Sequence, residues 1–177
     1  MVVPTDASLA HSALIVVDLQ QGTARNPFVM PADVVAERAG ELATAFRDRG
    51  LPVVIATFEL DRDDEPAFFG EPLSTLAVRA DDLRVARPGW SAFAGTDLDA
   101  QLRARGVTGL VLAGVATSIG VESTARAAHD LGYELVVASD AVTDLRAETH
   151  ENSLERVFPL IAKVATTRAI TDLRDRR

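Results

Sequence analysis

The chain has 177 residues, of which 47% are hydrophobic and 25% are charged, as in an ordinary soluble globular domain. Its formal net charge of -8 argues against binding nucleic acid or an anionic membrane, and the lack of cysteine excludes disulfides, zinc-thiolate sites and a thiol nucleophile. Because no leader or membrane span is recognisable, we expect a single cytoplasmic domain over residues 1–177, with no nucleic-acid or membrane partner.

The first half of the chain alternates between apolar runs and helical patterns. Short runs rich in β-branched residues predict strands at residues 13–19, 52–58 and 83–87. Apolar residues recur at helical spacing from Asp33, and Gly50 is well placed to end that helix. Residues 59–82 mix acidic residues, Pro and Phe, which predicts a long excursion containing a short helix.

The second half continues the alternation. Apolar runs predict strands at residues 108–114, 133–141 and 162–167. Thr96 and Asp99 match a capping box at the start of a helix that Gly106 would stop. The helix after residue 114 carries one apolar stripe and is expected to end at Gly132, and a last helix is expected to continue to about Pro159.

Alternating strands and helices, with strands apolar on both faces, predict an α/β protein with three layers. We expect a Rossmann-like fold with a parallel six-stranded sheet in the order 3-2-1-4-5-6 and helices on both faces. Such folds bind ligands at the carboxyl ends of their strands. This rule directs attention to Asp18, to Phe58 and the loop after it, to Arg87, and to residues 113–120.

Asp18 ends the first apolar run. A carboxylate at a strand end is partly desolvated, which raises its pKa and suits it to acid or base catalysis. A carboxylate that only anchors the loop explains its position equally well.

The stretch "ARPGWSAFAGTDLD" (86–99) combines a cation, a turn and two aromatic residues. Arg87 could bind a carboxylate with its guanidinium fork, and Trp90 and Phe93 could line a pocket. The alternative is a surface Arg beside a Trp that anchors the core.

The stretch "GVATSIG" (114–120) lies between a predicted strand and a helix, where backbone N–H groups can bind an anion or a developing oxyanion. The alternative is that Gly120 only permits close packing. Because the glycine spacing fits neither a phosphate loop nor a dinucleotide fingerprint, we expect no cofactor.

The remaining candidate ligands predict no metal site. His11, His129 and His150 are scattered along the chain and are expected to lie at the surface. The acidic residues between the second and third strands have no histidine among them, so solvation explains them better than metal binding: Asp61, Asp63, Asp64 and Glu65.

Nearly the whole chain resembles the isochorismatase-like hydrolase family, which includes nicotinamidases, N-carbamoyl amidases and isochorismatases. The matching stretches are "ALIVVDLQ", "RPGWSAFAGTDLD", "LVLAGVATSIGVESTARAAHDLGYELVVASDAV" and "KVATT". The family usually has a catalytic Asp, Lys and Cys. The resemblance places Asp18, Arg87 and Gly120 at these positions and implies a cis peptide bond between Val115 and Ala116.

Two of these three positions depart from the amidase pattern, so amide hydrolysis through an acyl-enzyme is excluded for this chain. Isochorismatases of the family resemble it in having Gly at the Cys position. They hydrolyse a vinyl ether, in which the Asp protonates carbon and water then adds. The nicotinamidase metal ligands should fall near residues 58–70, where no His is present, so the resemblance implies no zinc here.

Arg87 leaves two mechanisms open. It could pair with a substrate carboxylate, which would leave Asp18 free to take up a proton. Alternatively, Asp18 could act as a base on a water molecule that takes the place of the missing sulfur. In either case we expect an open space beside Gly120 that is free of side chains.

The resulting prediction is a cysteine-independent hydrolase for a small, carboxylated metabolite. The alternatives are an amidase or carbamoyl hydrolase inactivated at Gly120, and a non-catalytic small-molecule binding protein. The family resemblance implies a homodimer or homotetramer. Besides the three catalytic positions, the expected substrate-binding residues are Gln20, Phe28, Trp90, Phe93, Ala116 and Thr117.

Overall fold

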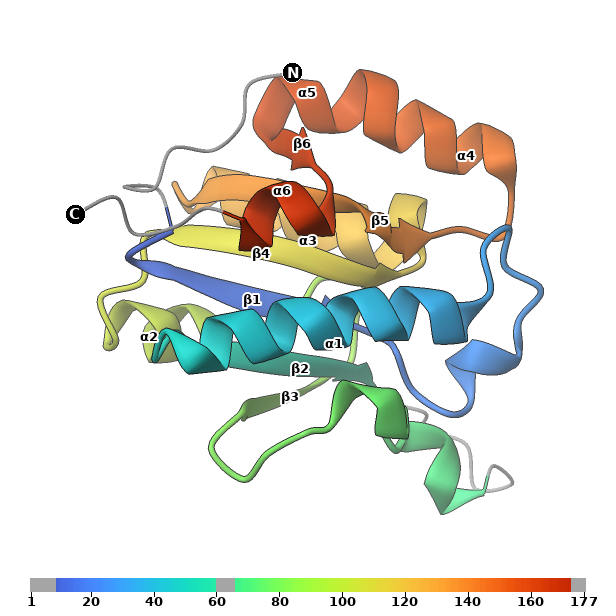
Figure 1. Ribbon diagram of the computed structural model, residues 1–177, viewed down its shortest axis with the longest axis horizontal. Helices are drawn as coiled ribbons and strands as arrows, with labels where there is room; N and C mark the ends of the chain where they lie inside the picture. Colours follow the sequence, from blue (N-terminus) through green and yellow to red (C-terminus); the bar gives the residue numbers. More distant parts are fainter. Residues whose placement is uncertain (1–8, 60–65, 173–177) are drawn as a thin grey trace.

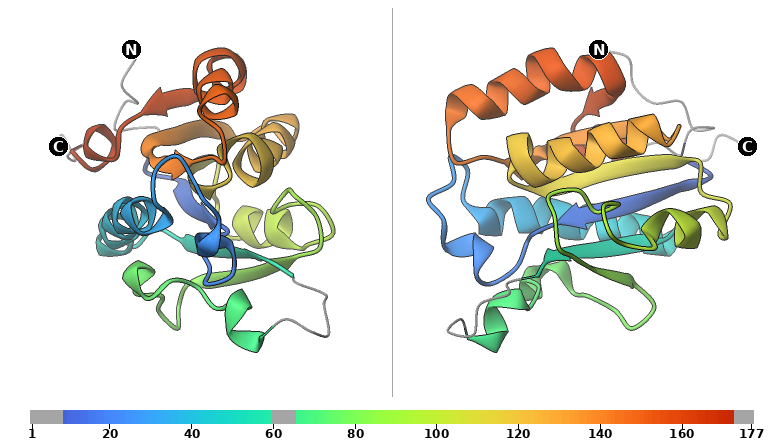
Figure 2. Two further views of the ribbon diagram at one scale, coloured as in Figure 1. Left: turned by 90° about the vertical axis from the view of Figure 1, so that its right-hand side faces the viewer. Right: turned by 180° about the vertical axis from the view of Figure 1, so that it is seen from behind.

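A computed structural model describes residues 9–59 and 66–172 and shows a central sheet between two layers of helices (Figures 1 and 2). Within these ranges the sheet has six strands: β1 (Ser12–Val17), β2 (Val53–Phe58), β3 (Leu83–Arg87), β4 (Gly109–Val115), β5 (Glu134–Thr143) and β6 (Lys163–Ala165). They pair in parallel in the order β3-β2-β1-β4-β5-β6, which confirms the predicted fold class and strand order.

Helices connect the strands. The α-helices of the described ranges are α1 (Ala32–Asp48), α2 (Leu98–Arg103), α3 (Glu122–Asp130), α4 (Ala147–Asn152), α5 (Phe158–Ile161) and α6 (Thr167–Thr171). Two π-helical turns, Thr117–Val121 and Ser153–Val157, precede α3 and join α4 to α5. In the part of the chain that the structure describes, no helix is both long and apolar enough to cross a membrane.

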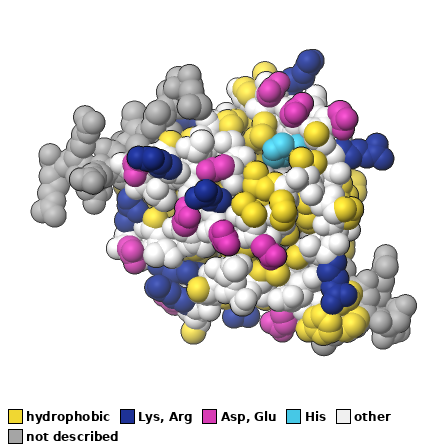
Figure 3. Space-filling model, turned by 45° about the vertical axis from the view of Figure 1, so that its right-hand side comes forward, with side chains coloured by type: hydrophobic (Ala, Val, Ile, Leu, Met, Phe, Trp, Pro, Cys, Tyr) yellow, Lys and Arg dark blue, Asp and Glu magenta, His cyan; other side chains and the backbone are white. Residues whose placement is uncertain are grey.

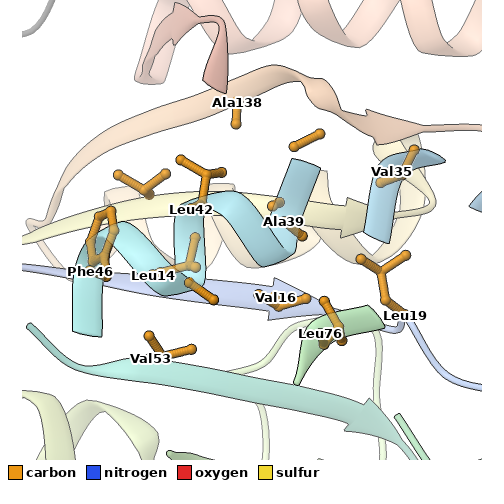
Figure 4. Close-up of a cluster of buried hydrophobic side chains, with 14 of the residues drawn as sticks. Leu14, Val16, Leu19, Val35, Ala39, Leu42, Phe46, Val53, Leu76 and Ala138 are labelled. Carbon is orange, nitrogen blue, oxygen red and sulfur yellow. The ribbon is translucent and has the colours of Figure 1, made fainter. Parts of the chain in front are cut away.

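Alternate residues of each strand pack into two hydrophobic cores, because successive side chains of a strand point to opposite faces of the sheet. Leu14 and Val16 pack under α1, beside Leu42 and Phe46, in the core shown in Figure 4. Ala13, Ile15 and Val17 point the other way and pack against buried residues of α2, α3 and α5. Both faces of β1 are therefore buried, as its continuous apolar run predicts.

The segment between β2 and β3 is more irregular than expected. It contains two 3-10 helices, Ala67–Gly70 and Ser74–Leu76, where one short helix was expected. The acidic residues Asp61, Asp63, Asp64 and Glu65 lie outside the described residues, so their solvated role stays a prediction.

The predicted capping box of α2 is wrong. The cap position is occupied by Asp97, without a side-chain cap. The Thr96 hydroxyl donates to the Ala92 carbonyl at 2.7 Å, and Asp99 accepts a hydrogen bond from the Tyr133 hydroxyl at 2.7 Å. The Thr96 hydroxyl also accepts from the Leu98 N–H at 3.4 Å, so Thr96 keeps local partners, whereas the distant Tyr133 binds the Asp99 carboxylate that the pattern assigned to the cap.

Candidate active site

Asp18 directly follows β1, at the edge of the sheet where the parallel strands end. Its backbone adopts the left-handed conformation, with φ of 53°, which Asp tolerates better than most residues. Its N–H donates to the Ala56 carbonyl on β2 at 2.9 Å. The backbone is therefore fixed to the neighbouring strand while the carboxylate is free to interact above the sheet edge.

Arg87 is the last residue of β3, two strands away from β1. Its side chain crosses the end of β2, and the guanidinium carbon lies 5.4 Å from the centre of the Phe58 ring. One terminal nitrogen, Nη2, donates to Asp18 Oδ2, and the other, Nη1, donates to the Gly89 carbonyl. Because the Arg87 side chain is only 1% exposed, this ion pair is buried.

Gly120 lies against the same ion pair. A Cβ atom added at Gly120 would lie 3.0 Å from Arg87 Nη2 and 3.3 Å from Asp18 Oδ2. The structure thus brings together the three positions that the family resemblance named as catalytic. It does not show the open space expected beside Gly120, because the guanidinium of Arg87 reaches into it and no side chain at position 120 keeps the guanidinium away.

Burial works against both charges of the pair. It raises the pKa of Asp18 to about 6, although the neighbouring Arg87 favours the ionised carboxylate. It also lowers the pKa of Arg87, and Asp18 opposes that shift. Within the described residues, Asp18 Oδ1 and Arg87 Nε are buried without a hydrogen-bond partner. One unused acceptor and one unused donor in a buried place are what a small polar ligand would satisfy.

The raised pKa of Asp18 predicts how stability depends on pH. The unfolded chain ionises Asp18 near 3.8 and the folded chain near 6, so the free energy of unfolding should fall by about 3 kcal/mol as pH rises through this interval. Urea unfolding between pH 3.5 and 7 would measure this slope. Asp18→Asn should remove that component; an identical slope in the variant would contradict the assignment.

The turn between β4 and α3 approaches the pair from the other side. Gly114 has φ of 121°, and a Cβ there would lie 2.0 Å from the Val17 carbonyl oxygen, so only glycine lets β4 come this close to β1. The peptide bond between Val115 and Ala116 is cis, as the resemblance implies. Ala116 is half-buried at the start of the turn, and its expected contact with substrate stays a prediction.

Gln20 has a different role from the predicted one. Its side chain is fully buried, and its amide oxygen accepts from the Phe58 N–H at 2.9 Å. Its amide nitrogen donates to the carbonyls of Phe58 and Phe69 at 3.3 and 3.4 Å. The amide therefore joins the end of β2 to the 3-10 helix Ala67–Gly70, and these hydrogen bonds leave no role for the expected contact with substrate.

The three predicted pocket aromatics lie in different places. Phe93 stacks on Tyr133, with ring centres 5.8 Å apart, and Tyr133 precedes β5 at the amino-terminal edge of the sheet. Phe93 thus belongs to the core beneath α2 and does not line the site. Trp90 follows Gly89 and is 64% exposed, and Phe28 is half-buried against the core under α1.

Thr117 and His150 form a contact that the sequence did not reveal. The Thr117 hydroxyl lies 2.9 Å from His150 Nδ1, and Thr117 is fully buried; its expected contact with substrate stays a prediction. His150 is half-buried, which corrects its predicted surface position, whereas His11 and His129 are exposed as expected. Burial lowers the pKa of His150.

Asp144 is a further buried acid of the site region that sequence reasoning missed. It is 2% exposed and accepts hydrogen bonds from the N–H groups of Ser118 and Leu145 at 2.6 and 2.7 Å. Because it directly follows β5, the rule of strand ends could have found it. In the described part of the chain, no group of three His, Asp or Glu side chains is arranged to hold a metal ion.

Comparisons with known proteins agree with this architecture. The Isochorismatase domain matches residues 12–169. The isochorismatase family protein YecD of Escherichia coli O157:H7 is 39% identical over 179 residues, which cover 90% of this chain and 94% of YecD. A solved isochorismatase family protein from Burkholderia thailandensis has a TM-score of 0.90 and 37% identity, over 96% of this chain and 97% of that one. N-carbamoylsarcosine amidase from Thermoplasma acidophilum has a TM-score of 0.78 and 28% identity, over 88% and 96%.

Proposed function

The chain belongs to the isochorismatase family, and from this premise we propose that it is a hydrolase that acts on a small carboxylated molecule without a cysteine. Asp18 is the acid, and Arg87 binds the substrate carboxylate. Backbone N–H groups around Ala116 and Gly120 stabilise the negative charge that remains on Asp18 after it has given up its proton. The observation that supports this proposal is the buried Asp18–Arg87 pair packed directly against a glycine.

A vinyl ether that carries a carboxylate suits these groups. The protonated Asp18 transfers its proton to the terminal carbon of the double bond, which leaves a cationic carbon beside the ether oxygen. Water adds to this carbon, and the carbon–oxygen bond to the leaving alcohol then breaks. The products are a ketone and an alcohol: one proton of the water restores the acid, and the other passes to the departing oxygen as the carbon–oxygen bond breaks. No bond to the protein forms at any step.

Two features favour this acid mechanism over a base acting on water in place of the sulfur. The guanidinium of Arg87 already reaches into the space beside Gly120 where that water would have to lie. In addition, a substrate carboxylate that pairs with Arg87 takes away the cation that stabilises the ionised form of Asp18. Substrate binding therefore promotes the protonated state that the first step requires.

The pH dependence of turnover tests this role. We expect kcat/KM for a carboxylated vinyl ether to fall by about tenfold per pH unit above about pH 6, because the free enzyme must carry the proton on Asp18. A panel of vinyl ethers, amides and carbamoyl compounds, each with and without a carboxylate, would be followed by NMR. Turnover of amides alone, or a rate that rises through the same pH range, would contradict the proposal.

An amidase or carbamoyl hydrolase that has lost its nucleophile is a second candidate, supported by the likeness to N-carbamoylsarcosine amidase. A non-catalytic binding protein is the third, and it would bind a carboxylate tightly without altering it.

We also propose a dimer or tetramer, because Figure 3 shows apolar side chains gathered on one face. The large apolar side chains exposed in the described residues are Val29, Val34, Phe68, Trp90, Leu131, Leu145 and Leu160.

A further inference from the structure

Two contacts hold the turn between β4 and α3 from the side of β5 and α4. The Thr117 hydroxyl lies 2.9 Å from His150 Nδ1 on α4. The next residue, Ser118, donates its backbone N–H at 2.6 Å to Asp144, which follows β5. Consecutive residues of the turn are thus attached to two neighbouring points of a different segment.

The burial of Thr117 and His150 indicates that they support the turn. Thr117 is fully buried and its hydroxyl pairs with His150 Nδ1, so we assign its hydroxyl to holding the turn. His150 is half-buried, and its contact with Thr117 spans 33 residues of sequence. Burial lowers the pKa of His150, so the imidazole is neutral at neutral pH and one ring nitrogen can accept a hydrogen bond from the Thr117 hydroxyl.

The turn needs such support because its geometry is unfavourable by itself. Residues 117–121 form a π-helical turn, a conformation that is rare and is frequently found at functional sites. Its last residues place Gly120 so close to the ion pair that an added Cβ would lie 3.0 Å from Arg87 Nη2. A small displacement of the turn would therefore change the fit between Gly120 and the Asp18–Arg87 pair.

We propose that His150 is a positioning residue, which acts through the Thr117 hydroxyl to fix the turn that carries Ala116 and Gly120 against the Asp18–Arg87 pair. The proposal deepens the proposed function, since it assigns the support of the N–H groups that stabilise negative charge there. His150 touches no reacting atom in this role.

Hydrogen exchange tests the positioning role without any substrate. In Thr117→Val, which keeps the shape of the side chain and removes the hydroxyl, the backbone N–H groups of residues 118–121 should exchange at least about fivefold faster. Thr117→Ser should restore the exchange rate of the wild type. His150→Leu should match Thr117→Val, and combining the two should add nothing further. Unchanged exchange in either single variant, or additive effects in the double variant, would overturn the proposal.

Kinetics provide the second readout, on whichever substrate the panel identifies. Thr117→Val and His150→Leu should lower kcat by about tenfold or more and change KM by less than threefold, because the turn is displaced while Arg87 stays in place. His150→Asn, which can place a polar atom near Nδ1, should restore much of the loss. The exposed His129→Asn on α3 is the control and should behave as the wild type.

The two readouts fail separately. Faster exchange with an unchanged kcat would overturn the positioning role and leave the proposed function standing. A wild-type protein that turns over no compound of the panel would contradict the proposed function, and hydrogen exchange alone would then decide whether His150 holds the turn.

Discussion

Asp18→Asn is expected to lower kcat at least a hundredfold on any substrate that the panel identifies. Asn has the same shape as Asp but cannot supply the acidic proton, and general acid catalysis typically contributes a factor of about 10² to 10⁴. KM should stay the same or fall, because removing the carboxylate leaves Arg87 without its buried counter-ion and more available to a substrate carboxylate. Steady-state kinetics at pH 5.5 would measure both constants.

A loss of kcat without a rise in KM separates an acid from a loop anchor. If Asp18 only anchored its loop, the substitution should weaken substrate binding and thermal stability together. Asp48→Asn is the matched control, since Asp48 is an exposed carboxylate at the end of α1 and should tolerate the change without effect. Full activity in Asp18→Asn would end the proposal of an Asp-driven hydrolase.

Gly120→Ala is expected to destabilise the protein by about 1–2 kcal/mol, although Ala normally favours a helix over Gly by about 1 kcal/mol. The added Cβ would lie 3.0 Å from both Arg87 Nη2 and Val17 Cγ1, so a neighbour must shift. Arg87→Lys in the same chain should recover part of the loss, because the shorter Lys lacks the guanidinium fork. Chemical unfolding of the two single variants and the double variant would measure the coupling.

Gly70→Ala is the control for this cycle. An added Cβ at Gly70 has no neighbour within 4 Å, so the same change should cost nothing there. Strictly additive effects of Gly120→Ala and Arg87→Lys would show that Arg87 and Gly120 do not share the space.

Substitutions at Gly120 and Arg87 also test whether the chain is an amidase that has lost its nucleophile. Gly120→Cys combined with Arg87→Lys would rebuild the Asp, Lys and Cys set that is usual in the family. If the second candidate function is right, this double variant should hydrolyse amides or carbamoyl compounds. The pH dependence of alkylation should then show that the pKa of its thiol is depressed. Gly120→Cys alone should do neither, because Arg87 stays in the way.

The outcomes for this variant are equally distinct. An ordinary thiol pKa together with no turnover in the double variant would contradict the lost-nucleophile interpretation. Amidase activity in Gly120→Cys alone would instead contradict the steric coupling between Arg87 and Gly120. Because the natural chain contains no cysteine, the introduced thiol is the single alkylation site.

The local pattern of apolar residues was sufficient to predict the architecture of the sheet. Residues 13–17 are apolar at every position, and β1 is buried on both faces, since a central parallel strand has helices above and below it. The alternation of strands and helices predicted the parallel sheet, and the pairing confirms the strand order that we expected for such a fold. The strand ends also pointed to Asp18, to Arg87 and to the turn that contains Gly120, and the family resemblance gave these residues their roles.

Side-chain partners were beyond local pattern. Thr96 and Asp99 have the spacing of a capping box, yet the Thr96 hydroxyl donates to Ala92 four residues earlier, and Asp99 accepts from Tyr133, which lies 34 residues away in the sequence and is brought close by the fold. We expected Gln20 to bind substrate, but its amide is hydrogen-bonded to three backbone groups, two of Phe58 on β2 and one of Phe69 in the following 3-10 helix.

The chain's own residues thus determined a parallel α/β sheet and the edge at which its chemistry lies, because burial and turn preferences are properties of short stretches. Only the tertiary structure decided that Arg87 closes over Gly120 and that His150 reaches Thr117. Asp18 and Arg87 are 69 residues apart, and their meeting depends on strand register and on the length of one side chain across β2. The distance between two such side chains depends on how the whole sheet packs, so it cannot be predicted from the sequence of either segment alone.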